Sequence, residues 1–225
     1  MVFENNIIEG KTIEDTWRDA IWCCVRNGYN YKIEKGSYEG QQRRQLEYVV
    51  VKIIEPWERP LAVTTPEGSG IPSPTSEESI NKYFISYIMG DEVAEGEDYS
   101  YGEFITKQID KIIEILNKSN GYSNQATISI GDSSSIHQND PPCLRCISFK
   151  RVNDKLNMTV YFRSWDCYSG FPENLGGLQL LKEYVLANLD FDIYDGEIIA
   201  FSDGLHIYEQ YFGLVNSLCV DKIKE

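Results

Sequence analysis

Three stretches of the chain place apolar residues three and four positions apart, the spacing of one buried helical face. The first begins after Thr12, whose hydroxyl can cap a helix, and Gly28 can end it. The second follows residues 75–78, which have capping-box spacing, and stops before Gly90. The third covers residues 101–116, and a further helix is expected over 175–189.

Other stretches are rich in Val, Ile and Tyr or alternate between apolar and polar residues, which is typical of strands. The polar residues 40–44, which include Arg43 and Arg44, look like a loop or the entrance to the first strand. Asn153 and Asp154 provide a hairpin turn between two later strands. The expected strands cover residues 45–54, 126–130, 143–150, 156–163 and 197–201.

Residues 55–75 contain five of the eight prolines, so we expect a surface loop or lid there. A domain linker is the other interpretation, but neither side alone carries an obvious complete core. A chain of 225 residues is within the size that one core can serve. We therefore expect a single domain over residues 1–225.

The formal net charge of -14, with no run rich in Lys or Arg, would repel a long phosphate backbone. Polymeric DNA or RNA is not an expected partner, whereas a few arginines in a cleft could hold a small anion. The chain has no apolar run near membrane-spanning length and no basic start followed by an apolar run, so we expect a cytoplasmic protein without a membrane partner. Its six cysteines should then be mostly free thiols, at least one of them reactive.

The candidate chemistry begins at Cys143, which follows two prolines. A thiolate at this position could add to C6 of a uracil ring and turn C5 into a nucleophile. A free thiol has a pKa of about 8.5, so a nearby cation such as Arg163 would be needed to raise the thiolate fraction. Arg163 could also hold the phosphate of the nucleotide, with the hydroxyl of Ser164 as a second donor.

Three further polar residues fit the same ligand. Asn174 could donate to O4 of uracil and accept from N3–H, whereas an Asp would suit cytosine. His206 and Tyr208, two apart on an extended segment, would face the same way and suit a sugar hydroxyl. Each residue alone has an ordinary structural explanation, such as a buried thiol, a helix cap or a satisfied core histidine. Their conjunction favours a site.

This conjunction closely resembles the thymidylate synthase family. The resemblance implies an α/β (α+β) fold in three layers, with a twisted mixed sheet, flanking helices and a cleft at the nucleophile. It also implies conversion of dUMP to dTMP without a bound cofactor or metal, the cosubstrate being methylene-tetrahydrofolate or methylene-tetrahydromethanopterin. The segments that carry it span about a third of the chain: Pro141-Pro142-Cys143, Arg163-Ser164-Trp165-Asp166, Pro172-Glu173-Asn174-Leu175 and Ser202-Asp203-Gly204-Leu205-His206-Ile207-Tyr208.

The resemblance also implies a role for each candidate residue. Cys143 would be the catalytic nucleophile, and the pterin ring would contact Asp166. The substrate would be held by Arg163, Ser164 and one of Arg43 or Arg44 at its phosphate, by Asn174 at uracil, and by His206 and Tyr208 at the sugar.

Several departures from the family concern the donor side. The family's catalytic glutamate would fall at Tyr83, with Glu78 only a remote substitute. The arginine pair lent across the family's dimer would fall near residues 123–125, which lack it, and Trp165 stands where the family often has a small residue. Only seventeen residues follow Tyr208, so we expect the extended C-terminal part that closes over folate in the family to be missing. The chain therefore looks like the short archaeal branch of the family, acting as a monomer or homodimer.

Three alternatives stay open. Cys143 and Cys146 have the C-x-x-C spacing of zinc and redox sites, although residues three apart on a strand point to opposite faces. A pyrimidine nucleotide hydroxymethylase would share the nucleophile but let water quench the exocyclic methylene. A non-catalytic nucleotide-binding protein is the third, favoured by the missing glutamate.

Overall fold

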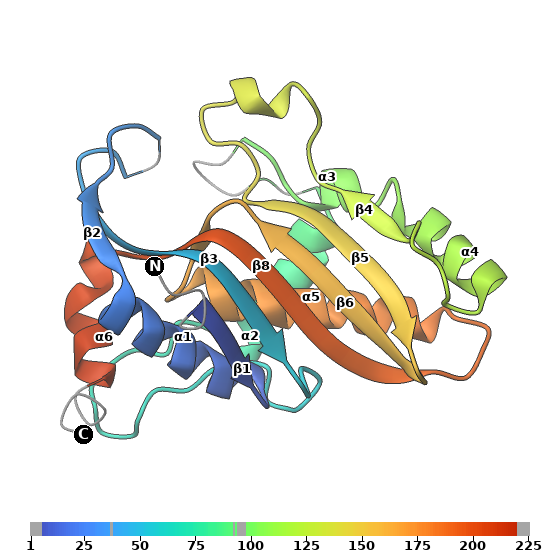
Figure 1. Cartoon of the computed structure of the whole chain (residues 1–225), viewed down its shortest axis with the longest axis horizontal. Helices are drawn as coiled ribbons and strands as arrows, with labels where there is room; N and C mark the ends of the chain where they lie inside the picture. The colour runs from blue at the N-terminus through green and yellow to red at the C-terminus, as the bar shows by residue number, and fades with distance from the viewer. Residues whose placement is uncertain (1–5, 37, 92, 94–97, 220–225) are drawn as a thin grey trace.

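The strands of the protein form one mixed sheet (Figure 1). The computed structural model describes residues 6–36, 38–91, 93 and 98–219, and within them eight strands pair in the order β1-β3-β8-β6-β5-β4, with β2 added to β3 and β7 to β8. The pairs β1–β3, β6–β8 and β7–β8 are parallel and the others antiparallel. The strands are β1 (Ile7–Gly10), β2 (Tyr29–Lys32), β3 (Gln42–Ile53), β4 (Thr127–Ser129), β5 (Leu144–Val152), β6 (Lys155–Phe162), β7 (Trp165–Asp166) and β8 (Tyr194–Tyr208).

Helices flank this sheet, which confirms the mixed α+β fold expected from the sequence. α1 packs on β3, and α5 packs on α1, α2 and β8; in Figure 1, α5 runs behind β8 and β6. The helices are α1 (Ile13–Asn27), α2 (Glu77–Tyr83), α3 (Gly102–Ile105), α4 (Ile109–Ser119), α5 (Gly170–Ala187) and α6 (Phe212–Leu218), with a π-helical turn η2 (Phe84–Ile88) and short 3-10 turns η3 (Ser135–His137) and η4 (Glu209–Tyr211). The end of the chain, residues 220–225, lies outside the described residues.

α1 begins and ends at the predicted signals. The hydroxyl of Thr12 accepts from the backbone N–H of Asp15, whose carboxylate accepts from the backbone N–H of Thr12. The N–H of Gly28 donates to the carbonyl of Cys24 and closes the last turn. The capping signals in the sequence therefore located both ends of this helix.

Two other helices differ from the predicted ones. The helix expected over residues 101–116 is broken into α3 and α4, because the side chain of Gln108 bonds the backbone of Phe104 and of Ser129 in β4. α5 begins at Gly170 rather than at residue 175. Its first turn is held by the carboxylate of Asp166, which accepts from nearby backbone N–H groups.

β8 is much longer than the strand predicted over residues 197–201. It continues to Tyr208 past an irregularity at Asp203, which lies opposite a similar one in β3. His206 and Tyr208 therefore belong to a central strand, and they pair with Gln45 and Arg43 of β3. The longer strand places both side chains of the predicted sugar site on a rigid element.

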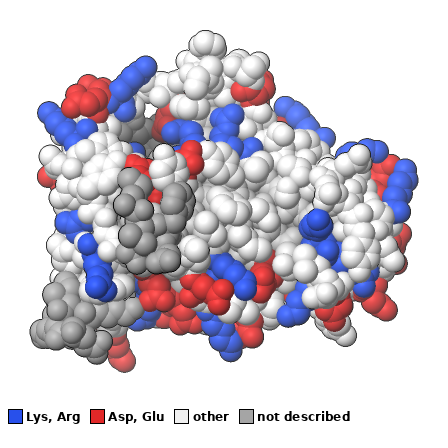
Figure 2. Space-filling model, viewed as in Figure 1, with Lys and Arg blue, Asp and Glu red and all other residues white. Residues whose placement is uncertain are grey.

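The sheet face opposite α5 is turned to the viewer in Figure 2. Its centre is largely free of charged side chains, while Lys, Arg, Asp and Glu gather around the edges. Phe201 of β8 is 41% exposed, whereas its neighbour Ala200 is buried. The alternation shows that α1 and α5 cover the other face, where the core lies.

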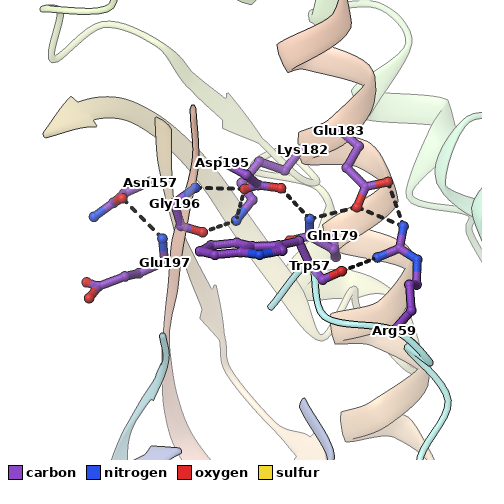
Figure 3. Close-up of polar contacts among 9 residues, drawn as sticks. All are labelled: Trp57, Arg59, Asn157, Gln179, Lys182, Glu183, Asp195, Gly196 and Glu197. Atoms are coloured by element: carbon purple, nitrogen blue, oxygen red, sulfur yellow. Dashed lines mark hydrogen bonds and ion pairs between the residues drawn. The ribbon is translucent and has the colours of Figure 1, made fainter. Parts of the chain in front are cut away.

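The Pro-rich segment 55–75 is a loop that also contributes to the core, since Leu61 and Val63 are 1% exposed. Its Trp57 lies beside the buried ammonium group of Lys182 on α5, 6.0 Å from the nitrogen to the ring centroid (Figure 3). Lys182 pairs with Asp195 of β8 at 2.8 Å and donates to the carbonyl of Gly196. This network fixes α5 against the sheet and the loop.

Candidate active site

A pocket of about 280 Å³ lies where β5 begins, where β8 ends and where α5 starts. Six of the nine predicted site residues line it: Cys143, Ser164, Asp166, Asn174, His206 and Tyr208. The remaining wall contains Tyr83, Tyr87, Tyr99, Tyr101, Trp165, Gly170 and Glu173. Segments far apart in the sequence thus bring a thiol, an amide, an imidazole and carboxylates to one cavity.

Cys143 lies just before β5 and is half-buried at the pocket wall. Its backbone N–H donates to the hydroxyl of Tyr99 at 3.2 Å, and the N–H of Leu144 donates to the hydroxyl of Tyr101 at the same distance. The carbonyl of Cys143 accepts from the backbone N–H of Arg163 at 2.9 Å. The backbone of the thiol is therefore fixed from both sides, and its side chain is open to the pocket.

Arg163 lies next to Cys143 but does not line the pocket. Its guanidinium bonds Asp140 at 2.8 Å, and its Nε lies 3.2 Å from the carbonyls of both Pro141 and Pro142. The side chain therefore holds the loop that leads into Cys143. Its contact with a phosphate stays a prediction.

Arg43 and Arg44 point to opposite faces of β3. Arg43 donates to the hydroxyl of Tyr208 at 3.2 Å and lies 5.0 Å from the centroid of that ring, which lines the pocket. Arg44 donates instead to Asn30 at 3.0 Å and lies over Phe212. Arg43 is thus the member of the pair that lies beside the pocket.

His206 is 1% exposed, and its imidazole lies nearly perpendicular to the Tyr208 ring, with the centroids 4.7 Å apart. Its Nδ1 lies 3.1 Å from the carbonyl of Gly204, so Nδ1 carries the hydrogen. Burial, followed by the positive charge of Arg43, lowers the pKa of His206 to about 3. The ring is therefore neutral, and its buried Nε2, which has no partner among the described residues, is a hydrogen-bond acceptor.

The amide of Asn174 is held between two aromatic side chains. Nε1 of Trp165 donates to its Oδ1 at 3.0 Å, and its Nδ2 donates to the hydroxyl of Tyr83 at 2.8 Å. The bond from Trp165 uses one of the two lone pairs on Oδ1, and the bond to Tyr83 uses one of the two hydrogens on Nδ2. A second lone pair and a second hydrogen can therefore meet a ligand side by side.

The carboxylate of Asp166 serves the protein backbone. It accepts from the N–H groups of Tyr168, Ser169 and Gly170 and from the hydroxyl of Ser169. Burial raises its pKa, although these four bonds favour the charged form. Asp166 thus positions the start of α5, and its predicted contact with a pterin stays a prediction.

Comparison with known proteins identifies the family to which the part of the chain around this pocket is similar. The family model described as "Thymidylate synthase" matches residues 85–224. The chain belongs to the thymidylate synthase family. The match covers the whole of the motif segments from Pro141 to Tyr208.

Relatives at low identity extend the similarity to the rest of the chain. A protein of Methanosarcina acetivorans is 27% identical over 220 residues, which is 94% of each chain. One of Methanothermobacter thermautotrophicus is 28% identical over 222 residues, 91% of this chain and 94% of its own, and one of Methanopyrus kandleri is 23% identical over 212 residues, 91% and 93%. All three carry the name "Putative thymidylate synthase".

The sequence reasoning missed Glu173. This side chain lines the pocket and also a second cavity of about 270 Å³, whose other walls include Lys82, Ser86 and the rings of Tyr83 and Tyr87. Glu78 is exposed and lines neither cavity. The sequence did contain one signal for it, because Glu173 is a charged residue directly before Asn174 in one of the segments that resemble the family.

The tyrosines of the pocket were also missed. Tyr83 and Tyr87 stack with their centroids 5.2 Å apart, and the rings of Tyr87 and Tyr101 lie nearly perpendicular with their centroids 5.1 Å apart. Tyr87 fits an ordinary apolar helical face. Tyr83 was noted only as the position of the family's catalytic glutamate, so neither was predicted to line a pocket. Within the described ranges, no three His, Cys, Asp or Glu side chains gather as metal ligands do, and no helix is long and apolar enough to cross a membrane.

Proposed function

We propose that this protein is a one-carbon transferase that converts dUMP to dTMP with a reduced pterin as the donor. The supporting observation is that one pocket holds the thiol of Cys143, the amide of Asn174 and the neutral imidazole of His206. The free donor and acceptor of Asn174 match O4 and N3–H of uracil. The acceptor Nε2 of His206 matches a sugar hydroxyl.

The phosphate would lie between Arg43 and Arg163. Among the described residues no carboxylate pairs with Arg43, and its Nε is buried without a partner. Arg163 uses Nε and Nη2 for its own loop, which leaves Nη1 for a phosphate oxygen beside the hydroxyl of Ser164. Guanidinium groups suit this task because they offer several donors in one plane.

The thiolate of Cys143 adds to C6, which moves the electrons of the C5–C6 double bond toward O4. Asn174 stabilises the charge that develops on O4. C5 then attacks the methylene of the donor and loses its proton, and the pterin leaves from that methylene. A hydride from the reduced pterin makes it a methyl group, and the thiolate departs from C6.

Glu173 would handle the protons of this reaction. Glu173 lines both cavities, so it would lie beside the nucleotide in the first and beside the pterin in the second, where the planar rings of Tyr83 and Tyr87 would face the pterin. A general base in such a position contributes about a hundredfold to ten-thousandfold in rate. Folate-type and methanopterin-type donors would both present a flat ring to this wall.

The test is tritium release from [5-³H]dUMP by the purified protein, with methylene-tetrahydrofolate and methylene-tetrahydromethanopterin compared. We expect release with at least one donor, dTMP as the nucleotide product and no release by Cys143→Ala. Hydroxymethyl-dUMP in place of dTMP would support the hydroxymethylase instead. Binding of dUMP without release by either donor would support a non-catalytic nucleotide-binding protein.

A further inference from the structure

The hydrogen bond between Trp165 and Asn174 fixes which way the amide points. A carboxamide has an oxygen on one side and an NH₂ group on the other, and a half-turn exchanges them. An indole nitrogen can only donate a hydrogen bond, so the atom 3.0 Å from Nε1 of Trp165 must be the oxygen. The hydroxyl of Tyr83 can donate or accept, so it would tolerate either orientation.

Trp165 itself cannot turn away. Its side chain is 1% exposed and lies between two aromatic rings, Phe162 at 4.4 Å and Phe171 at 4.5 Å between centroids, with interplanar angles of 4° and 20°. A buried N–H without a partner would also be costly. The indole therefore presents a fixed donor to Asn174.

Uracil and cytosine present opposite patterns of hydrogen-bond donors and acceptors to such an amide. Uracil offers an acceptor at O4 and a donor at N3, whereas cytosine offers a donor at N4 and an acceptor at N3. An amide free to make a half-turn could pair with either base. An amide that is fixed can pair with one of them only, because the other would oppose donor to donor and acceptor to acceptor.

We infer that Trp165 is a positioning residue that sets pyrimidine specificity by fixing the amide of Asn174 in one orientation. The inference rests on the proposed function, since the pocket must bind a pyrimidine nucleotide. Tyr83 completes the bonding of the amide without choosing its orientation. Loss of the indole N–H should therefore relax the choice of base, and loss of the Tyr83 hydroxyl should not.

The experiment measures the dissociation constants of dUMP and dCMP by calorimetry for the wild type and three variants. Trp165→Phe keeps an aromatic ring in the stack but removes the donor. Tyr83→Phe removes the other partner of the amide. Trp17→Phe is the matched control, because Trp17 is also 1% exposed and its Nε1 donates to the backbone carbonyls of Cys167 and Tyr168 rather than to Asn174.

We expect the ratio of the dCMP to the dUMP dissociation constant to fall by about tenfold or more in Trp165→Phe, the scale of one bidentate base contact. In Tyr83→Phe and Trp17→Phe the ratio should stay within about threefold of the wild type, even where both affinities drop. An unchanged ratio in Trp165→Phe, or an equal fall in Tyr83→Phe, overturns the inference.

The same measurements cover a variant that does not fold, and they distinguish failure of the inference from failure of the proposed function. If Trp165→Phe does not fold, Phe171→Leu, which loosens one side of the stack, must lower the same ratio, and an unchanged ratio there overturns the inference. A wild type that binds neither nucleotide overturns the proposed function and the inference together. A wild type that prefers dUMP over dCMP while Trp165→Phe leaves the ratio of the two dissociation constants unchanged overturns the inference alone.

Discussion

Arg163 donates to the carboxylate of Asp140 across 2.8 Å, and the same guanidinium bonds the carbonyls of Pro141 and Pro142. The pair thus restrains the loop that ends at Cys143. Both side chains are about one-third exposed, so the pair contributes little to stability, about 0–1 kcal/mol. We expect the pair to have a larger effect on the binding of the phosphate that Arg163 is proposed to hold.

The first prediction is that Asp140→Asn strengthens dUMP binding by about twofold to tenfold. The substitution removes a negative charge near the proposed phosphate and releases the guanidinium for it. Calorimetry with dUMP and with deoxyuridine, which has no phosphate, separates this effect from a change in the loop. Equal changes for the two ligands would contradict a role through the phosphate.

The second prediction concerns Glu173. Glu173→Gln should lower kcat by about a hundredfold or more while the dissociation constant of dUMP changes less than about threefold, because a proton-transfer group acts on the reaction and not on ground-state binding. The matched control is Glu78→Gln, since Glu78 is exposed and lines neither cavity. Equal losses of kcat in the two variants would show that Glu173 has no specific role in the reaction.

The third prediction follows from the buried His206. Its pKa is lowered to about 3 in the folded protein from 6.5, so the unfolded chain binds a proton that the folded one does not between these values. The stability that a neutral His206 provides is complete above pH 6.5 and is lost as pH falls toward 3, at up to about 1.4 kcal/mol per pH unit. Urea unfolding from pH 7 to pH 4 should show a steeper loss for the wild type than for His206→Gln. Parallel curves would contradict the burial of a neutral ring.

The fourth prediction concerns the network of Figure 3. Lys182→Met should lower the free energy of unfolding by about 3–5 kcal/mol, because Asp195 then loses its ammonium partner at 2.8 Å. The double variant with Asp195→Asn should recover part of this loss, since it removes the unpaired charge. Denaturant unfolding measures both, and a change below about 1 kcal/mol for Lys182→Met would contradict a structural role.

The same lysine gives a pH dependence of known sign. Burial lowers the pKa of Lys182 to about 8 from 10.5, so the folded protein releases its proton first as pH rises. The unfolded chain then binds more protons between pH 8 and 10.5, and the wild type should gain stability over that range relative to Lys182→Met. A difference that stays constant over this range would show that the pKa is not lowered.

Much of the fold and part of the site followed from local signals in the sequence. Thr12 and Gly28 marked the ends of α1, and the segments around Cys143, Arg163, Asn174 and His206 indicated the family. Such signals depend on neighbours in the chain, so a single sequence carries them. The strand β8 was underestimated because Asp203 and Gly204, which interrupt an apolar run, lie at an irregularity that β3 matches from a distant part of the chain.

Other features depend on contacts that no local pattern contains. Arg43 and Arg44 are adjacent in sequence, and only the pairing of Arg43 with Tyr208 shows which one lies beside the pocket. The bond from Trp165 to Asn174 and the place of Glu173 between two cavities arise from where α5 begins, which Asp166 determines. The sequence contained these residues but not their relative positions.

The most direct test of the account uses 5-fluoro-dUMP with the pterin donor and intact-mass spectrometry. Fluorine at C5 cannot leave as the proton does, so a thiolate that has added to C6 should stay attached. We predict a mass increase equal to the nucleotide plus the methylene-pterin, located on the peptide that contains Cys143 and absent in Cys143→Ala. An unmodified wild type, or an adduct on Cys146 instead, would contradict the proposal that Cys143 is the nucleophile.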